Sequence, residues 1–140
     1  MIAYFDTSAV VPLIVEEPTS GECESVWLSS ERVVSCRLLY PEARAALAAA
    51  QRCGRLSADG LRRAVDLLGG IVREIDAVAI DESLARDAGS LAEHHGLRGY
   101  DAVHLAAAAA VRTDQTVMVT GDHALRDAAA AAGLGVVNLS

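Results

Sequence analysis

The stretch Ile2-Ala3-Tyr4-Phe5-Asp6 places an acid at the end of a short apolar run, and Val117-Met118-Val119-Thr120-Gly121-Asp122 repeats this arrangement near the other end of the chain. Both runs have the composition of buried β-strands. Open parallel sheets bind ligands at the carboxyl edge of their strands, where Asp6 and Asp122 would both lie. Carboxylates beside buried strands are costly to desolvate and repel one another, so a bound divalent cation would resolve both problems.

Between these two runs, β-branched segments alternate with alanine- and leucine-rich segments of helical periodicity. The expected strands are 2–5, 33–35, 77–80, 116–119 and 136–139. The expected helices are 7–15, a helix ending at about 29, 41–52, 60–74, 82–95, 100–112 and 123–132. Strands separated by helices predict an α/β fold in which helices cover both faces of a parallel sheet.

Composition sets the scale of the molecule. A chain of 140 residues with 52% hydrophobic content is large enough for one core, so we expect a single domain over residues 1–140. No apolar stretch is long enough to cross a membrane, and no basic region precedes the first apolar run, which favours a soluble cytoplasmic protein. The three cysteines, Cys23, Cys36 and Cys53, have no close pairing, so we expect reduced, buried thiols.

Charge is distributed unevenly. The net charge is −7, yet residues 32–73 contain eight arginines and three acids. This asymmetry fits a basic arm beside an acidic pocket, and it fits equally well an ordinary solvated helix surface. The chain has no lysine, which excludes a P-loop and disfavours aspartyl-phosphate chemistry.

Two further acids stand at helix starts: Glu42 in the first turn of helix 41–52 and Asp101 at the opening of helix 100–112. Each of the four acids has a plain structural explanation. Asp6 and Asp122 could cap helices, and Glu42 and Asp101 could simply favour a helix amino terminus.

Four motifs occur in a fixed order. Asp6-Thr7-Ser8-Ala9 follows the first strand, Glu42 lies early in the third helix, Arg98-Gly99-Tyr100-Asp101-Ala102-Val103-His104-Leu105-Ala106 opens a later helix, and Thr120-Gly121-Asp122 follows the fourth strand. Over nearly its whole length the chain resembles PIN-domain ribonucleases, and most closely the VapC toxins of bacterial toxin–antitoxin pairs. The resemblance implies a PIN fold, a Mg²⁺- or Mn²⁺-dependent endoribonuclease acting on RNA, a cognate antitoxin that inhibits it, and a homodimer.

The chemistry of the four acids agrees with this resemblance. Mg²⁺ prefers hard oxygen ligands and keeps several of its waters, so two direct carboxylates suffice. We expect Asp6 and Asp101 to be the direct metal ligands. Glu42 and Asp122 would complete the catalytic site, either through water or by holding a second cation.

Three polar neighbours of these acids have open roles. His104, three residues after Asp101, lies on the same helical face and could touch substrate or a water, although a satisfied core histidine is the more common case. Ser8 and Thr120 could orient an acid or water, or could satisfy a helix cap and a strand end.

Two other classes of function stay open at this point. One is a catalytically silent PIN-fold module that only binds RNA or an antitoxin, although all four acids are present. The other is an aspartate-nucleophile phosphohydrolase, which normally carries a second aspartate two residues after the first, where this chain has Ser8.

Overall fold

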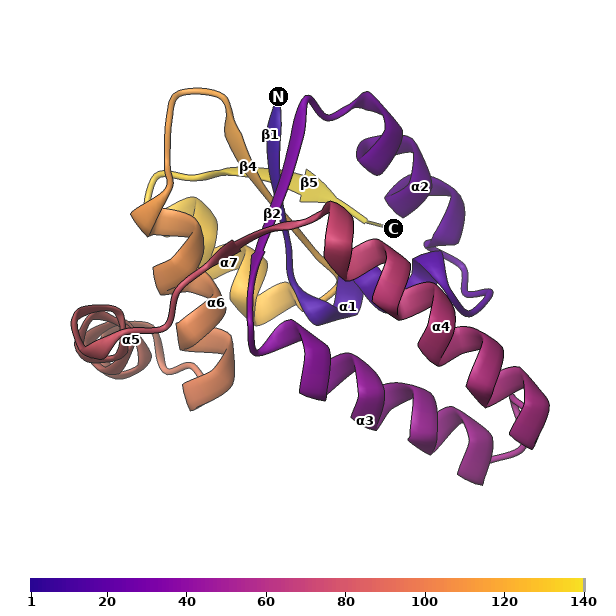
Figure 1. Cartoon of the computed structure of the whole chain (residues 1–140). Helices are drawn as coiled ribbons and strands as arrows, with labels where there is room; N and C mark the ends of the chain where they lie inside the picture. Colours follow the sequence, from indigo (N-terminus) through magenta and orange to yellow (C-terminus); the bar gives the residue numbers. More distant parts are fainter. Residues whose placement is uncertain (140) are drawn as a thin grey trace.

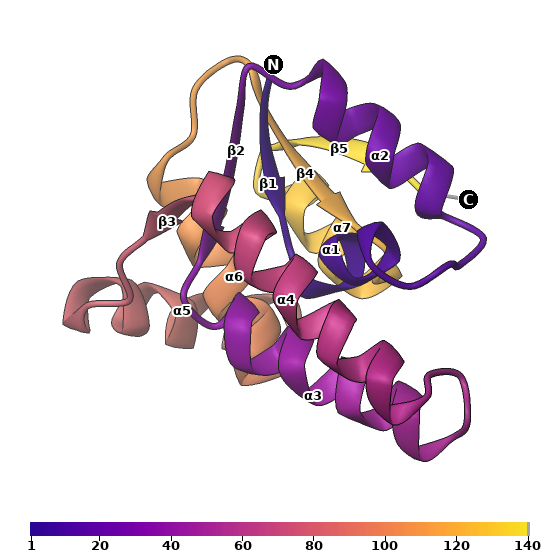
Figure 2. The same cartoon turned by 45° about the vertical axis from the view of Figure 1, so that its right-hand side comes forward.

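The computed structural model describes residues 1–139 and shows a five-stranded, fully parallel sheet (Figures 1 and 2). The strands are β1 (Ile2–Phe5), β2 (Arg32–Cys36), β3 (Asp76–Val78), β4 (Thr116–Thr120) and β5 (Gly135–Asn138). Their order in space is β3-β2-β1-β4-β5. The chain therefore builds outward from β1 on one side and returns to β4 on the other, which makes the β1/β4 boundary the point where strand order reverses. Ligands bind at this position in open α/β sheets.

Helices cover both faces of the sheet, as predicted. They are α1 (Thr7–Val10), α2 (Ser20–Ser29), α3 (Leu39–Arg52), α4 (Ala58–Glu74), α5 (Glu82–His95), α6 (Gly99–Ala110) and α7 (His123–Ala131), with a 3₁₀ turn, η1 (Val11–Leu13). Successive strand residues point to opposite faces. Tyr4 and Met118 join a core with α5, α6 and α7, whereas Phe5 and Val119 join a second core with α1 to α4. The predicted α/β class is confirmed.

The helix expected over 7–15 is wrong in its extent. The α-helix ends at Val10, and Val11–Leu13 continues as a 3₁₀ turn that contains Pro12. Proline has no N–H to donate to the preceding turn, so it ends the regular α-helical ladder here. The other predicted segments are present, with ends that match the expectation or differ from it by one or two residues.

The α3–α4 pair, the length of the helices and the cysteine side chains complete the description of the fold. In Figures 1 and 2, α3 and α4 lie side by side and extend together away from the sheet. Within residues 1–139, no helix combines the length and apolar character needed to cross a bilayer. All three cysteines are free, as predicted, but the expectation of burial is wrong for Cys53, which is exposed near the end of α3.

Candidate active site

The four predicted acids, Asp6, Glu42, Asp101 and Asp122, line one cavity of about 370 Å³. They come from separate parts of the chain: the end of β1, the first turn of α3, the first turn of α6 and the residue preceding α7. The parallel sheet brings them together because the carboxyl ends of β1 and β4 are adjacent, with Phe5 opposite Val119.

Asp6 is the most buried of the four, with 4% of its surface exposed. Its Oδ1 accepts hydrogen bonds from Ser8 Oγ (2.7 Å) and the Ala9 backbone N–H (3.2 Å), and its Oδ2 accepts one from Thr120 Oγ1 (2.7 Å). Desolvation raises the pKa of Asp6 from 3.8 to about 6, although these hydrogen bonds act in the opposite direction. Ser8 and Thr120 therefore hold a carboxylate that would otherwise resist ionisation.

Capping and cavity lining coexist at Asp6 and at Asp122. Asp6 caps α1 through its contact with the Ala9 N–H, and Asp122 caps α7 by accepting from the Leu125 N–H at 3.0 Å. Each cap occupies one carboxylate oxygen and fixes the side chain at a helix amino terminus, where negative charge is favourable. The structural explanation is therefore correct for both acids and leaves them in the cavity.

Glu42 is anchored at one oxygen. Its Oε1 accepts from Thr7 Oγ1 at 2.8 Å and lies 2.7 Å from His104 Nε2. Burial alone would raise the pKa of Glu42, but the hydrogen bonds from His104 and Thr7 outweigh it and hold this pKa below its usual value. Glu42 is therefore a carboxylate kept in its charged form at the cavity wall.

Asp101 and Asp122 both pair with the guanidinium of Arg98. Arg98 Nε lies 3.1 Å from Asp101 Oδ2, and Arg98 Nη2 lies 3.3 Å from Asp122 Oδ2. The guanidinium also stacks on the Tyr100 ring, 4.9 Å from its centroid. Because the Arg98 side chain is 64% exposed, this bridge is screened by solvent and can exchange for another cation.

The cavity carries a large excess of negative charge. Five carboxylates line it, those of Asp6, Glu17, Glu42, Asp101 and Asp122, and Arg98 is the one arginine among the lining residues of the described chain. Within residues 1–139, no three acidic, histidine or cysteine side chains converge into a preformed metal cage. The arrangement attracts cations and repels a phosphate that arrives alone.

Comparison with known proteins identifies the family. The model of the PIN domain matches residues 3–131. This chain belongs to the PIN-domain family. Ribonuclease VapC45 of Mycobacterium tuberculosis is 39% identical to this PIN domain over 135 residues, covering 96% of this chain and 94% of the relative.

Solved structures agree on the PIN fold. PAE2754 from Pyrobaculum aerophilum has a TM-score of 0.71 at 20% identity, covering 98% of this chain and 84% of that one. A toxin–antitoxin complex from Klebsiella pneumoniae has a TM-score of 0.65 at 16% identity, covering 99% and 98%. Together with the family match, these neighbours confirm the predicted PIN fold and its parallel sheet.

Sequence reasoning missed several residues of this PIN domain's cavity. Arg98 stands three residues before Asp101, a helical spacing that signals an ion pair, yet it was given no role. Thr7 stands in the first motif and at the start of an expected helix, but neither position predicts its contact with Glu42. Nothing in the sequence points to Glu17. The structure gives a contact to each of the three residues whose roles the sequence leaves open. His104 contacts Glu42, and Ser8 and Thr120 donate hydrogen bonds to Asp6.

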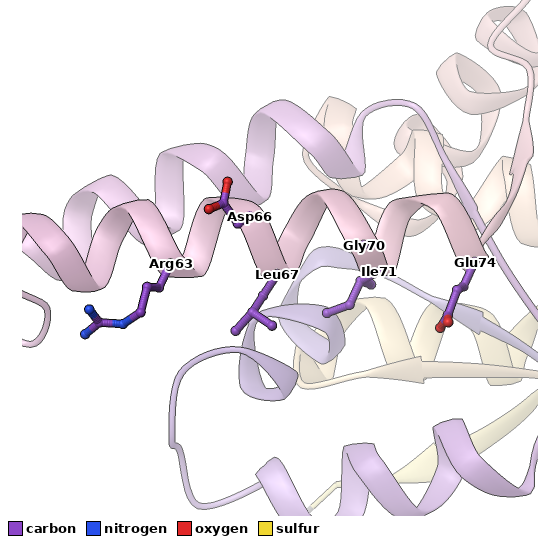
Figure 3. A pocket seen from close by; sticks show the side chains of 6 residues that line it. All are labelled: Arg63, Asp66, Leu67, Gly70, Ile71 and Glu74. Atoms are coloured by element: carbon purple, nitrogen blue, oxygen red, sulfur yellow. The ribbon is translucent and has the colours of Figure 1, made fainter.

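The basic arm does not line the cavity. Of its arginines, Arg55 comes into contact with a cavity residue by pairing with Glu17 at 3.4 Å, and Arg62 pairs with Asp59 on its own helix. Arg63 lies at a different hollow of about 590 Å³ along α4, shown in Figure 3 with Asp66, Leu67, Gly70, Ile71 and Glu74. That hollow is mostly apolar at its centre and is separate from the acidic cavity.

Proposed function

We propose that this PIN domain is a Mg²⁺- or Mn²⁺-dependent endoribonuclease that acts as the toxin of a toxin–antitoxin pair. The observation that carries the proposal is the convergence of Asp6, Glu42, Asp101 and Asp122 on one cavity at the strand-order reversal of the sheet. The 39% identity to Ribonuclease VapC45 over nearly the full length supports RNA as the substrate class.

The donor set fits a hard divalent cation. The four acids offer carboxylate oxygens, which are hard ligands. Mg²⁺ commonly binds one or two carboxylates and keeps several waters, so it does not need a preformed cage of protein ligands. Asp6 and Asp101 would hold the ion, with Glu42 and Asp122 acting through water or at a second cation. When bound, such a cation neutralises charge on the phosphate and activates water for hydrolysis.

The chain's own residues prepare this site. Ser8 and Thr120 fix both oxygens of Asp6, and His104 with Thr7 fixes one oxygen of Glu42. Arg98 is exposed at the cavity and paired with two of the acids, and its guanidinium could donate to a non-bridging phosphate oxygen if those pairings were released. The excess of carboxylates then makes phosphate binding conditional on the cation.

Two protein partners belong to the proposal: a cognate antitoxin and a second copy of the chain. The antitoxin is supported by the likeness to VapC relatives and by the toxin–antitoxin complex among the fold neighbours. Large apolar side chains are exposed on α2 and α4, where Leu28 is 75% and Leu67 is 56% exposed. Their exposure supports a protein partner that covers these helices. We propose that the pair acts in the cytoplasm, where its RNA would be found.

The experiment is RNA cleavage by the purified protein with Mg²⁺, with Mn²⁺ or with EDTA. Asp101→Asn should reduce cleavage to background, whereas Asp81→Asn, which changes a capping aspartate on α5 outside the cavity, should cleave like the wild type. RNA binding without cleavage by the wild type would select the catalytically silent module. Release of phosphate from small esters, with RNA left intact, would select the phosphohydrolase.

A further inference from the structure

A chain of hydrogen-bonded side chains runs from the core to the cavity. The Tyr4 hydroxyl lies 2.9 Å from His104 Nδ1, and His104 Nε2 lies 2.7 Å from Glu42 Oε1, which also accepts from Thr7 Oγ1 at 2.8 Å. Tyr4 is fully buried and His104 is 2% exposed. Tyr4 and His104 are 100 residues apart in the sequence, and His104 and Glu42 are 62 residues apart. Only the fold brings these three side chains together.

Tyr4 and His104 place polar atoms in the apolar core, where polar groups are costly to bury. Tyr4 belongs to a core cluster with Leu105, Ala107 and Met118, and His104 is buried as well. A polar group buried in this way costs free energy unless it is hydrogen-bonded. Among residues 1–139, every buried side-chain nitrogen and oxygen has a partner. The partner that satisfies His104 Nε2 is an acid of the cavity rather than another core group.

The geometry fixes the direction of the contact with Glu42. A carboxylate oxygen can only accept, so Nε2 is the donor to Glu42 Oε1 whether the ring is neutral or carries a second proton on Nδ1. The edge of the Tyr4 ring meets the imidazole at 75° with centroids 5.8 Å apart, and Cys36 Sγ lies 3.7 Å from Nδ1. These contacts leave the imidazole little freedom to turn.

Glu42 keeps one oxygen for a ligand. His104 and Thr7 both contact Oε1, and Oε2 has no hydrogen bond within residues 1–139. Asp6 is held at both oxygens, with two donors on Oδ1 and Thr120 on Oδ2, so a lone pair of Oδ2 is what it would offer to a cation. The two donors on Oε1 restrict the rotation of the Glu42 carboxylate, so Oε2 is presented from a fixed place on the cavity wall.

We infer that His104 is a positioning residue, held by Tyr4, that fixes Glu42 for the reaction in the cavity. The inference rests on the proposed nuclease function and adds to it a residue outside the four acids. His104 itself touches neither substrate nor metal in this account. Partners that orient an active-site ligand in this way typically contribute about 10- to 100-fold to activity or metal affinity.

Two variants of similar size separate positioning from simple core packing. The amide of Gln in His104→Gln reaches about as far as Nε2 and can still donate to Glu42, whereas the amide of Asn in His104→Asn reaches only the Nδ1 side, next to Tyr4. The matched control is Thr116→Val, which removes buried hydrogen bonds with Thr113 at the opposite edge of the sheet. It destabilises the protein without approaching the cavity.

The measurements are single-turnover cleavage at saturating RNA, KM, Mn²⁺ affinity by calorimetry, and Tm. His104→Asn should lower the cleavage rate and Mn²⁺ affinity by about 10-fold or more with little change in KM, and His104→Gln should restore most of both. In a Glu42→Gln background, adding His104→Asn should cause no further loss, because the two residues act as one unit.

Four outcomes test the positioning role. Equal losses in His104→Asn and His104→Gln that follow Tm as in Thr116→Val would overturn the positioning role, as would additive losses with Glu42→Gln. If the wild type binds Mn²⁺ without cutting RNA, the nuclease proposal fails while the Mn²⁺ affinities of the same variants still test His104. Cleavage by the wild type with an unaffected His104→Asn variant overturns the positioning role alone.

Discussion

Asp6→Asn should stabilise the metal-free protein at neutral pH. Burial raises the pKa of Asp6 from 3.8 to about 6, so the folded state favours the protonated carboxyl. The resulting penalty on folding is small below pH 4, grows as pH rises, and is complete above about pH 6. The two pKa values correspond to a penalty of about 3 kcal/mol at pH 7.5 and roughly half of that at pH 5.

Asparagine carries no charge and escapes this penalty at every pH. Its amide nitrogen replaces one oxygen that accepts from Ser8 or Thr120, and the rearranged hydrogen bond should cost about 1 kcal/mol. The free energy of unfolding of Asp6→Asn should therefore exceed that of the wild type by about 2 kcal/mol at pH 7.5, and the two proteins should be nearly equally stable at pH 5.

The assay is urea unfolding in EDTA at pH 5.0, 6.0 and 7.5. Asp81→Asn, a capping aspartate that accepts from the Leu84 N–H on α5, measures what an Asn cap costs by itself. A difference between Asp6→Asn and the wild type that stays constant across the three pH values, or that favours the wild type at pH 7.5, would refute the reasoning. Added Mn²⁺ should stabilise the wild type and leave Asp6→Asn unchanged.

Three further predictions concern the surface of the molecule. Arg98→Gln removes a cation that pairs with Asp101 and Asp122, so Mn²⁺ should bind a few-fold more tightly at low salt and the gain should shrink at high salt, as measured by calorimetry. Replacing four arginines of the basic arm by Gln should raise the Kd for RNA at low salt and flatten its salt dependence, while single-turnover cleavage at saturating RNA changes little; an unchanged slope would mean that these side chains only solvate helices. The four are Arg52, Arg55, Arg62 and Arg63. Light scattering without antitoxin should show a homodimer at high micromolar concentration, and a monomer there would contradict the proposed assembly.

The backbone architecture could be predicted because its causes are local. Runs such as 116–119 alternate with helical periodicity, and this alternation requires a parallel sheet with helices on both faces. Asp6 follows β1 directly and Asp122 follows β4 after Gly121, so a parallel sheet has to place them at the same edge. The end of the first helix could not be predicted, because Pro12 is compatible both with an α-helical first turn and with the 3₁₀ turn that forms there.

The sequence by itself determined the class of fold and the common edge of Asp6 and Asp122, since these depend on periodicity and on where strands end. Glu42 and Asp101 stood out in the sequence by their motifs at helix starts, which do not place them at that edge. Only the tertiary structure decided which side chains control those acids. The order β3-β2-β1-β4-β5 places Thr120 beside Asp6 and packs α6 so that His104 reaches both Tyr4 and Glu42. Such contacts join residues far apart in the chain, and their energies depend on distances and burial that no local pattern specifies.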